Sequence, residues 1–277
     1  MRQGQLWRGM ALGLLVLAAL AMGWTSPEAA GDLRPSPDAV EYGMAAVALA
    51  RLQPPEVRVA GIAVPPRYPF GFPLLATPFV RWAAQGGEPQ PHAAVLASAA
   101  AGAVVVGCLA VAGWQAFGAA TAMVAVALVL VSPFYGTYAR LVMAEMPTAA
   151  LFGAMAAVVA LSAGQPSARG RWWGAGLGLL MAAAVSVRLG NVQAVPAVAA
   201  GLWCAAPQRR AGALTSLVIA LAIGTMPLLA YNATTYGSPL TTGYHLWTPE
   251  WMEGGRQQFA LRYALDSPAL PAGAVQG

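Results

Sequence analysis

Lysine is absent from this chain of 277 residues, and charged residues of all kinds make up only 9% of it. About a quarter of the residues of a soluble domain are charged, so this scarcity argues against a soluble globular protein. Hydrophobic residues make up 58% of the chain, and the mean hydropathy is +0.59. We therefore expect lipid to surround most of the chain. The net charge of +5 needs no nucleic-acid partner, because arginines that orient a membrane protein account for it.

Cysteine and histidine are also scarce. The two cysteines, Cys108 and Cys204, both lie in apolar runs and form no CxxC pair, so the sequence contains no disulfide framework. The two histidines, His92 and His245, are too few for a histidine-rich metal site. The chain has no glycine-rich phosphate loop of the P-loop or Rossmann kind, which argues against a nucleotide site.

Long apolar segments are abundant. About 20 apolar residues are needed for a helix to cross a bilayer, with a range of roughly 17–25, so the sequence predicts an all-α integral membrane protein with about seven transmembrane helices. The candidate spans are 8–24, 93–112, 117–134, 147–163, 172–188, 190–206 and 213–231. The first span also fits a signal peptide, but we interpret it as uncleaved because many more spans follow. The fifth and sixth meet at 188–191, either as a tight hairpin or as one broken helix.

Arginines in the short loops predict the orientation. If the spans alternate, all three basic clusters fall on one side, which the positive-inside rule makes the cytoplasm. These clusters are Arg2 with Arg8, Arg169 with Arg171, and Arg209 with Arg210. The N-terminus is then cytoplasmic. The segments expected outside are 25–92, 135–146, 188–191 and the chain from 232 onward.

The long first external loop, 25–92, is expected to contain interfacial amphipathic helices, because loops of this length are often functional. Ser36 and Pro37 are typical of a helix start, and Asp38, Glu41 and Tyr42 share one face of the helix expected over 36–52. Residues 65–83 mix proline, glycine and aromatics with an apolar run too short to span. They indicate an interfacial or re-entrant segment.

Further charged residues are predicted on the same external side. Arg140 and Glu145 precede the fourth span, and Arg188 ends the fifth. Each has an ordinary explanation: an acid near a helix start favours the helix dipole, and an arginine can extend to the interface. Together with Asp38 and Glu41, however, they gather on one face of a charge-poor protein. Arginine suits a phosphate, and a partly buried carboxylate suits a general base.

Aromatic and hydrogen-bonding residues follow the seventh span. Tyr231, Asn232, Tyr236, Tyr244, His245 and Trp247 lie within 228–247. An aromatic belt at the membrane interface explains them, and a sugar-contacting surface is the functional alternative. Asn232 also begins a short match to a glycosylation sequon, Asn-Ala-Thr.

Several stretches, in this order, resemble the polytopic GT-C glycosyltransferases, and in particular bacterial glycosyltransferase family 39, which is related to protein O-mannosyltransferases and lipid A aminoarabinose transferases. They are PDAVEYGMAA, RYPFGFPLL, ARLVMAEMPTAALF, SVRLGN and YNATTYGSPLTTGY. The resemblance covers about residues 8–247. It implies a GT-C-like transmembrane domain over 1–247 in a bacterial inner membrane, with its active face extracytoplasmic.

The resemblance also implies an activity: transfer of a sugar, with inversion, from a polyprenyl-phosphate donor to a lipid, glycan or protein acceptor. It makes Asp38 or Glu41 the catalytic base, leaving open which of the two, and assigns the lipid phosphate to Arg140, Arg188 and Glu145. Sugar or substrate contacts are expected from Tyr42, Tyr68, Asn232, Tyr244 and His245. No cofactor is required, although a divalent cation held by Asp38 and Glu145 stays open.

The chain departs from this family in length. Family members usually have more spans and often a soluble C-terminal domain, whereas only an external tail, 248–277, remains here. A truncated or minimal member is the expectation, which leaves its activity open.

Two other classes of function remain. A multi-span transporter or flippase of a lipid-linked or small substrate would explain short, broken apolar segments, and it predicts inverted repeats and charged groups at mid-membrane. A non-catalytic scaffold would leave the acids and arginines as interface residues.

Overall fold

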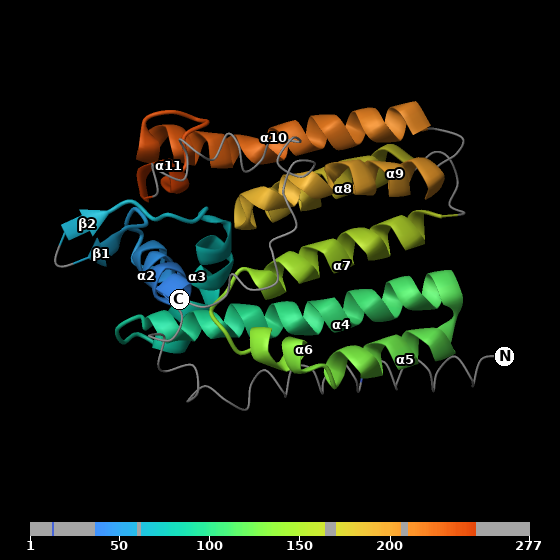
Figure 1. Ribbon diagram of the computed structural model, residues 1–277, viewed down its shortest axis with the longest axis horizontal. Helices are drawn as coiled ribbons and strands as arrows, with labels where there is room; N and C mark the ends of the chain where they lie inside the picture. Colours follow the sequence, from blue (N-terminus) through green and yellow to red (C-terminus); the bar gives the residue numbers. More distant parts are fainter. Residues whose placement is uncertain (1–12, 14–36, 60–61, 164–169, 206–209, 248–277) are drawn as a thin grey trace, which may run out of the picture.

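The computed structural model describes residues 13, 37–59, 62–163, 170–205 and 210–247, and the first predicted span, 8–24, lies almost entirely outside them. Six helices run side by side along a common direction and form a bundle (Figure 1). These helices are α4 (Val95–Phe117), α5 (Ala119–Leu130), α7 (Glu145–Ser162), α8 (Gly170–Val187), α9 (Val195–Ala205) and α10 (Arg210–Tyr236).

Within the described residues, three helical segments are long and apolar enough to cross a membrane: Pro91–Phe117, Glu145–Ser162 and Arg210–Tyr236. Two more apolar segments, Ala119–Leu130 and Leu189–Ala205, are shorter. At this level the chain fits the expected membrane protein. The span boundaries differ from the prediction, because α4 continues to Phe117 and turns at Gly118, whose φ of 89° suits glycine. The predicted span 117–134 is instead divided between α5 and the short helix α6 (Pro133–Tyr138).

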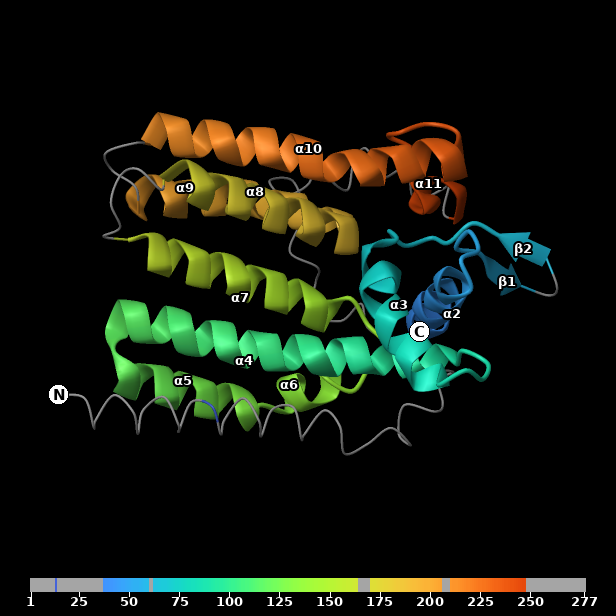
Figure 2. The same ribbon diagram turned by 180° about the vertical axis from the view of Figure 1, so that it is seen from behind.

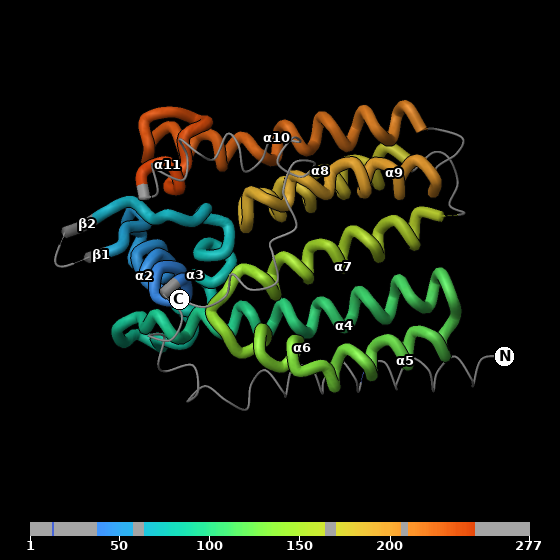
Figure 3. The backbone as a smooth tube through the Cα atoms, in the orientation of Figure 1, coloured from blue at the N-terminus to red at the C-terminus, as the bar shows by residue number. Residues whose placement is uncertain are grey.

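The fifth and sixth predicted spans form a hairpin. Helix α8 ends at Val187, the 3₁₀ helix η3 (Leu189–Ala194) follows, and α9 runs back beside α8 (Figure 3). Asn191 is buried within η3, where its side-chain amide donates to the carbonyl of Ala184 at 2.8 Å and to the Thr148 hydroxyl at 3.3 Å. These bonds fix the turn against the ends of α7 and α8.

Close backbone packing joins α8 to α10. A Cβ added at Gly174 would lie 2.1 Å from the Ala213 carbonyl oxygen, and one at Gly178 would lie 2.3 Å from that of Leu217. Glycines spaced by four residues let two helices approach in this way, and such packing matters in lipid, where burial of apolar surface drives association only weakly.

The remaining elements lie at one end of the bundle (Figure 2). They are α2 (Pro37–Ala50), the antiparallel strands β1 (Val57–Val59) and β2 (Ile62–Val64), α3 (Gly71–Ala84), η1 (Pro91–Ala94) and α11 (Gly243–Trp247). The two-stranded β1–β2 sheet is an exception to the all-α prediction, and its valines favour strand. Helix α2 lies within the predicted stretch 36–52, whose Ser36 is outside the described residues, and α3 begins within the predicted stretch 65–83 and ends one residue after it.

This end of the molecule has its own apolar core. Phe72 and Val80 of α3 are fully buried against Tyr42 of α2, together with Val142 of the segment before α7 and Val187 at the end of α8. A Cβ at Gly71 would meet the Ser186 backbone at 2.3 Å, so the start of α3 packs directly on the end of α8. The core thereby fixes α2 and α3 relative to the bundle.

Candidate functional site

A cavity of about 650 Å³ lies where five segments meet: α2, residues 67–69, the start of α7, the α8–η3 junction and the 242–245 segment. Its lining carries the charged residues Asp38, Arg67, Glu145 and Arg188. The other lining residues are Tyr42, Tyr68, Pro69, Met143, Ala144, Leu189, Gly190, Val192, Gln193, Thr242, Tyr244 and His245. Segments far apart in sequence thus contribute to one polar site at the end of an apolar bundle.

Asp38 and Glu41 lie about one turn apart on α2 but face different surroundings. Asp38 lines the cavity, whereas Glu41 does not and is only 6% exposed. Glu41 accepts backbone hydrogen bonds through Oε1 from the N–H groups of Arg67 and Tyr68, the latter at 2.8 Å. Burial raises the pKa of Glu41, and these two hydrogen bonds and the nearby Arg67 charge oppose that rise. Glu41 therefore holds the 67–68 backbone in place.

Arg67 is the charged partner of Asp38. Its Nη2 donates to Asp38 Oδ1 at 2.9 Å and to the Tyr68 hydroxyl at 2.6 Å, while its guanidinium lies 4.4 Å from the Tyr68 ring centroid. Its Nε is 3.8 Å from Glu41 Oε2, and this buried nitrogen has no hydrogen-bond partner among the described residues. The segment before it is fixed from the other side, because the Tyr236 hydroxyl donates to the Pro66 carbonyl at 2.8 Å.

A wall of aromatic rings borders the two acids of α2. The rings of Tyr42 and Tyr68 stack with centroids 4.8 Å apart, and Tyr244 meets Tyr68 edge-on at 5.7 Å. Burial raises the pKa of the Tyr42, Tyr68 and Tyr244 hydroxyls, so all three stay protonated at neutral pH.

A second acid–arginine pair lines the cavity. Arg188 Nη1 donates to Glu145 Oε1 at 3.1 Å, and the Arg188 side chain is 55% exposed. Glu145 begins α7, and Arg188 follows the last residue of α8. The other carboxylate oxygen, Glu145 Oε2, is buried and has no hydrogen-bond partner among the described residues.

Most of the residues predicted for the site come together, and three lie elsewhere. Asp38, Tyr42, Tyr68, Glu145, Arg188, Tyr244 and His245 all line the cavity. Glu41 is buried and does not line the cavity. Arg140, exposed just after α6, does not line the cavity, and Asn232 is buried with its amide bound to the Pro239 carbonyl at 3.1 Å. In the cavity lining, His245 Nδ1 accepts the Thr242 backbone N–H at 3.1 Å.

Arg67 is the site residue that the sequence analysis did not select. It stands in RYPFGFPLL, the stretch that supplied Tyr68, and it is the only charged residue there. A single charge in an apolar, proline-rich segment was the sequence feature that could have identified Arg67 as a site residue.

The acids do not form a metal centre in the described part of the chain, where no group of three or more histidine, cysteine, aspartate or glutamate side chains is placed to hold an ion. Asp38 and Glu145 each contact an arginine instead. A divalent cation prefers several oxygen ligands, so these residues do not fit one.

Comparison with known proteins does not place the chain in a family. No family model matches it, and neither a curated protein nor a solved structure matches it.

Proposed function

We propose that this chain is a membrane glycosyltransferase that moves a sugar from a polyprenyl-phosphate donor to an acceptor on the extracytoplasmic side, with inversion. The observation that carries the proposal is the cavity itself, in which a carboxylate, two arginines and tyrosines meet at one end of an apolar bundle. A lipid-linked donor requires that placement, because its phosphate lies at the membrane edge and its chain lies in lipid.

The proposed chemistry assigns the base to Asp38. Its carboxylate takes the proton from an acceptor hydroxyl, and the acceptor oxygen forms a bond to the anomeric carbon. The bond from that carbon to the phosphate oxygen breaks, and the phosphate leaves with the electron pair. Arg67 and Arg188 stabilise the negative charge that develops on this leaving group.

Asp38 and Arg67 are bound to each other in the ligand-free structure, at 2.9 Å. A donor phosphate that reaches Arg67 would compete with Asp38 for the same guanidinium. Donor binding would then leave Asp38 free to accept a proton. Glu41 acts here as a positioning residue, since it holds the backbone of Arg67.

The sidedness of charge supports the proposed orientation. Arg171 and Arg210 stand at the starts of α8 and α10. These helix starts lie at the end of the bundle opposite α2, α3 and α11 (Figure 2), whereas α2 and the 242–245 segment line the cavity. The positive-inside rule favours a cytoplasmic location for that end, which puts the cavity outside. We also propose that the membrane is a bacterial inner membrane and that the N-terminus is cytoplasmic.

The transporter alternative predicts charged groups at mid-membrane. In the six bundle helices the only charged residues are Glu145, Arg171 and Arg210, and each is the first or second residue of its helix. The charge distribution therefore favours chemistry at the membrane edge over passage through the bundle.

A transfer assay tests the proposal. Membranes that contain the protein are supplied with radiolabelled polyprenyl-phosphate sugars, and wild type is compared with Asp38→Asn. The control is Glu88→Gln, which removes an exposed acid that pairs with Arg51 away from the cavity. We expect transfer by wild type and Glu88→Gln and its loss in Asp38→Asn. Absence of transfer by wild type from every donor would contradict the proposal.

A further inference from the structure

The acids of this chain are distributed unevenly. Residues 89–144 and 146–249 contain no aspartate or glutamate. Every acid in the described ranges belongs to α2, to the segments that lead into β1 and η1, or to the start of α7. These elements lie at the cavity end of the molecule, where α7 begins (Figure 2). At the opposite end, where α8 and α10 begin, the described residues include arginines but no carboxylate.

Trp203 of α9 holds Arg210 in place at this end. The Arg210 guanidinium lies 4.7 Å from the Trp203 ring centroid, and its Nε donates to the Trp203 carbonyl at 3.2 Å. These contacts leave both terminal nitrogens of the guanidinium without a hydrogen-bond partner among the described residues. Each of those nitrogens can therefore donate to a ligand.

Arg171 lies beside the start of the same helix. A Cβ added at Gly212, in the first turn of α10, would be 3.7 Å from Arg171 Nε. Both arginines stand in the first turn of a helix, where a cation is unfavourable beside the helix dipole, and like charges repel each other. The positive-inside rule explains why arginines lie on this side of the membrane. It does not explain why two of them gather at one helix start with no described acid, and a bound anion would relieve that repulsion.

The surface around these arginines is suited to a lipid. Trp172, the residue after Arg171, is 77% exposed, and Trp203 is 45% exposed. Tryptophan is favoured at the headgroup level of a bilayer. On α10, Leu214 and Val218 follow Arg210 at intervals of four residues, so they lie on the same side of the helix. Val218 is 60% exposed and about 12 Å deeper along the helix axis, so apolar surface continues below the charge.

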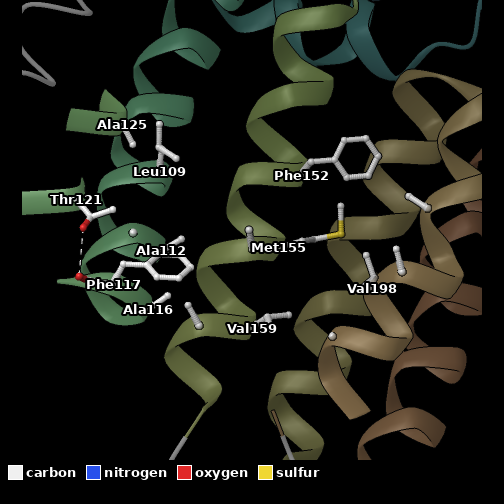
Figure 4. Close-up of a pocket in the computed structure, with 16 residues that line it drawn as sticks. Leu109, Ala112, Ala116, Phe117, Thr121, Ala125, Phe152, Met155, Val159 and Val198 are labelled. Carbon is white, nitrogen blue, oxygen red and sulfur yellow. Dashed lines mark hydrogen bonds between the residues drawn. The ribbon is translucent and has the colours of Figure 1, made fainter. Parts of the chain in front are cut away.

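The apolar cavity inside the bundle offers no alternative site for an anion. It has a volume of about 670 Å³ and no charged residue in its lining. Figure 4 shows Phe117 of α4 on one side of it, with Met155 of α7 and Val198 of α9 on the other. The Thr121 hydroxyl, which is in the lining, donates back to the Phe117 carbonyl at 3.4 Å. An anion at this end of the bundle would therefore bind at the surface, where the arginines lie.

We propose that this surface binds one anionic phospholipid from the leaflet on its side of the membrane. The residues of this basic patch are Arg171, Trp172, Trp203 and Arg210. The two arginines donate to the phosphate oxygens of the lipid, the tryptophans lie at the level of its glycerol, and an acyl chain follows Leu214 and Val218. The inference is separate from the glycosyltransferase proposal, because it concerns the opposite end of the molecule.

The net charge of the headgroup decides which lipid the patch prefers. A zwitterionic headgroup carries its own cation, which the arginines repel, whereas an anionic headgroup adds only attraction. Basic residues beside a membrane surface attract anionic lipids in the same way. We therefore expect phosphatidylglycerol to bind more tightly than phosphatidylcholine with the same acyl chains.

The first test titrates the purified protein in detergent with each of these two lipids and measures bound lipid by native mass spectrometry. For wild type we expect a Kd for phosphatidylglycerol about tenfold lower than for phosphatidylcholine, equivalent to about 1.4 kcal/mol. The double variant Arg171→Gln with Arg210→Gln should bind the two lipids equally. Retention of the preference in this double variant would overturn the proposal.

Two further double variants separate the patch from other effects. Arg51→Gln with Arg81→Gln removes the same amount of charge from exposed positions at the cavity end, and it should keep the wild-type preference. Arg171→Lys with Arg210→Lys keeps the charge and should keep most of the preference, because an ammonium also binds phosphate. Loss of the preference in either variant would contradict a charge-based site in the patch.

The source of the phosphate is tested by thermal unfolding. Phosphatidylglycerol should raise the Tm of wild type by more than inorganic phosphate at the same concentration, because the free anion lacks the acyl chains. Equal stabilisation by the two would mean that the patch takes a free anion, and the lipid proposal would be wrong.

The last test uses membranes rather than detergent. Phosphatidylglycerol with a photoreactive group on one acyl chain is cross-linked in vesicles, and the labelled peptides are identified by mass spectrometry. We expect the region of Leu214 and Val218 to be labelled more than by a photoreactive phosphatidylcholine. Equal labelling would mean that bulk lipid covers this surface, and it would overturn the proposal. None of these measurements depends on sugar transfer, so the two proposals can fail independently.

Discussion

Asp38 and Glu41 lie close together on α2, yet removal of their charges should have very different effects on transfer. Asp38→Asn keeps the size of the side chain but removes the proton acceptor from the cavity. General base catalysis contributes about 10²- to 10⁴-fold to a rate, so we expect a loss of at least a hundredfold.

Glu41→Gln should lower the rate less than tenfold. The Oε1 atom of glutamine can still accept the backbone N–H groups of Arg67 and Tyr68, which are the bonds that Glu41 makes. The substitution removes one attraction to Arg67, whose Nε lies 3.8 Å away, but it also removes the cost of burying a carboxylate. The 67–68 backbone should therefore keep its position.

The assay measures initial rates with a radiolabelled donor in membranes, normalised to the amount of folded protein in each sample. Thermal unfolding of the purified variants provides the folding control, because Asp38→Asn removes the closer of the two carboxylates beside Arg67. Equal losses of activity in the two variants, or a greater loss in Glu41→Gln, would refute the assignment of Asp38 as the base.

Four further outcomes are expected. Arg188→Ala should weaken binding of polyprenyl phosphate about tenfold or more, since a charged hydrogen bond contributes about 1.5–3 kcal/mol; an unchanged Kd in a binding assay would contradict this. Gly178→Leu should destabilise the protein by about 1–3 kcal/mol or more through overpacking against α10, seen as a lower Tm. Burial raises the pKa of Glu41 above its ordinary 4.5, so just above that pH the folded state binds more protons than the unfolded state, and the free energy of unfolding should fall as pH rises through this window. Thermal unfolding measured against pH should show a smaller fall for Glu41→Gln than for wild type. Identical profiles for the two proteins would contradict this. A cysteine in place of Glu88 should react with an impermeant thiol reagent from outside intact cells, whereas the exposed Cys204, near the other end of the bundle, should react only after lysis.

Hydropathy was sufficient to predict apolar helices but not their ends. Within a continuous apolar run no polar residue marks where one helix stops, so the boundary after α4 depends on Gly118 and that after α5 on Pro133, which begins α6. The hairpin at 188–191 was one of two alternatives, and it depends on the buried amide of Asn191. Tertiary contacts of this kind leave no periodic pattern in the sequence.

The candidate site was predictable where charge scarcity made a residue conspicuous. Asp38, Glu145 and Arg188 stand out in an apolar chain, and the structure brings them to one cavity. Arg67 does not follow a helical pattern, because it lies in an irregular segment whose course depends on Glu41. Arg140 was grouped with Arg188 by its predicted side of the membrane, and sidedness alone does not fix position around the bundle.

The pairing of charges in the cavity bears on how an anionic ligand would bind. The two cavity arginines each contact a carboxylate, Arg67 with Asp38 and Arg188 with Glu145. The Arg67–Asp38 pair is partly buried, where an unpaired charge is costly, so this pairing stabilises the ligand-free protein. The binding free energy of a phosphate would then be the difference between the free energy of its own contacts with the arginine and that of the acid–arginine contacts it displaces. Specific binding therefore requires contacts beyond the phosphate, which the cavity tyrosines would supply.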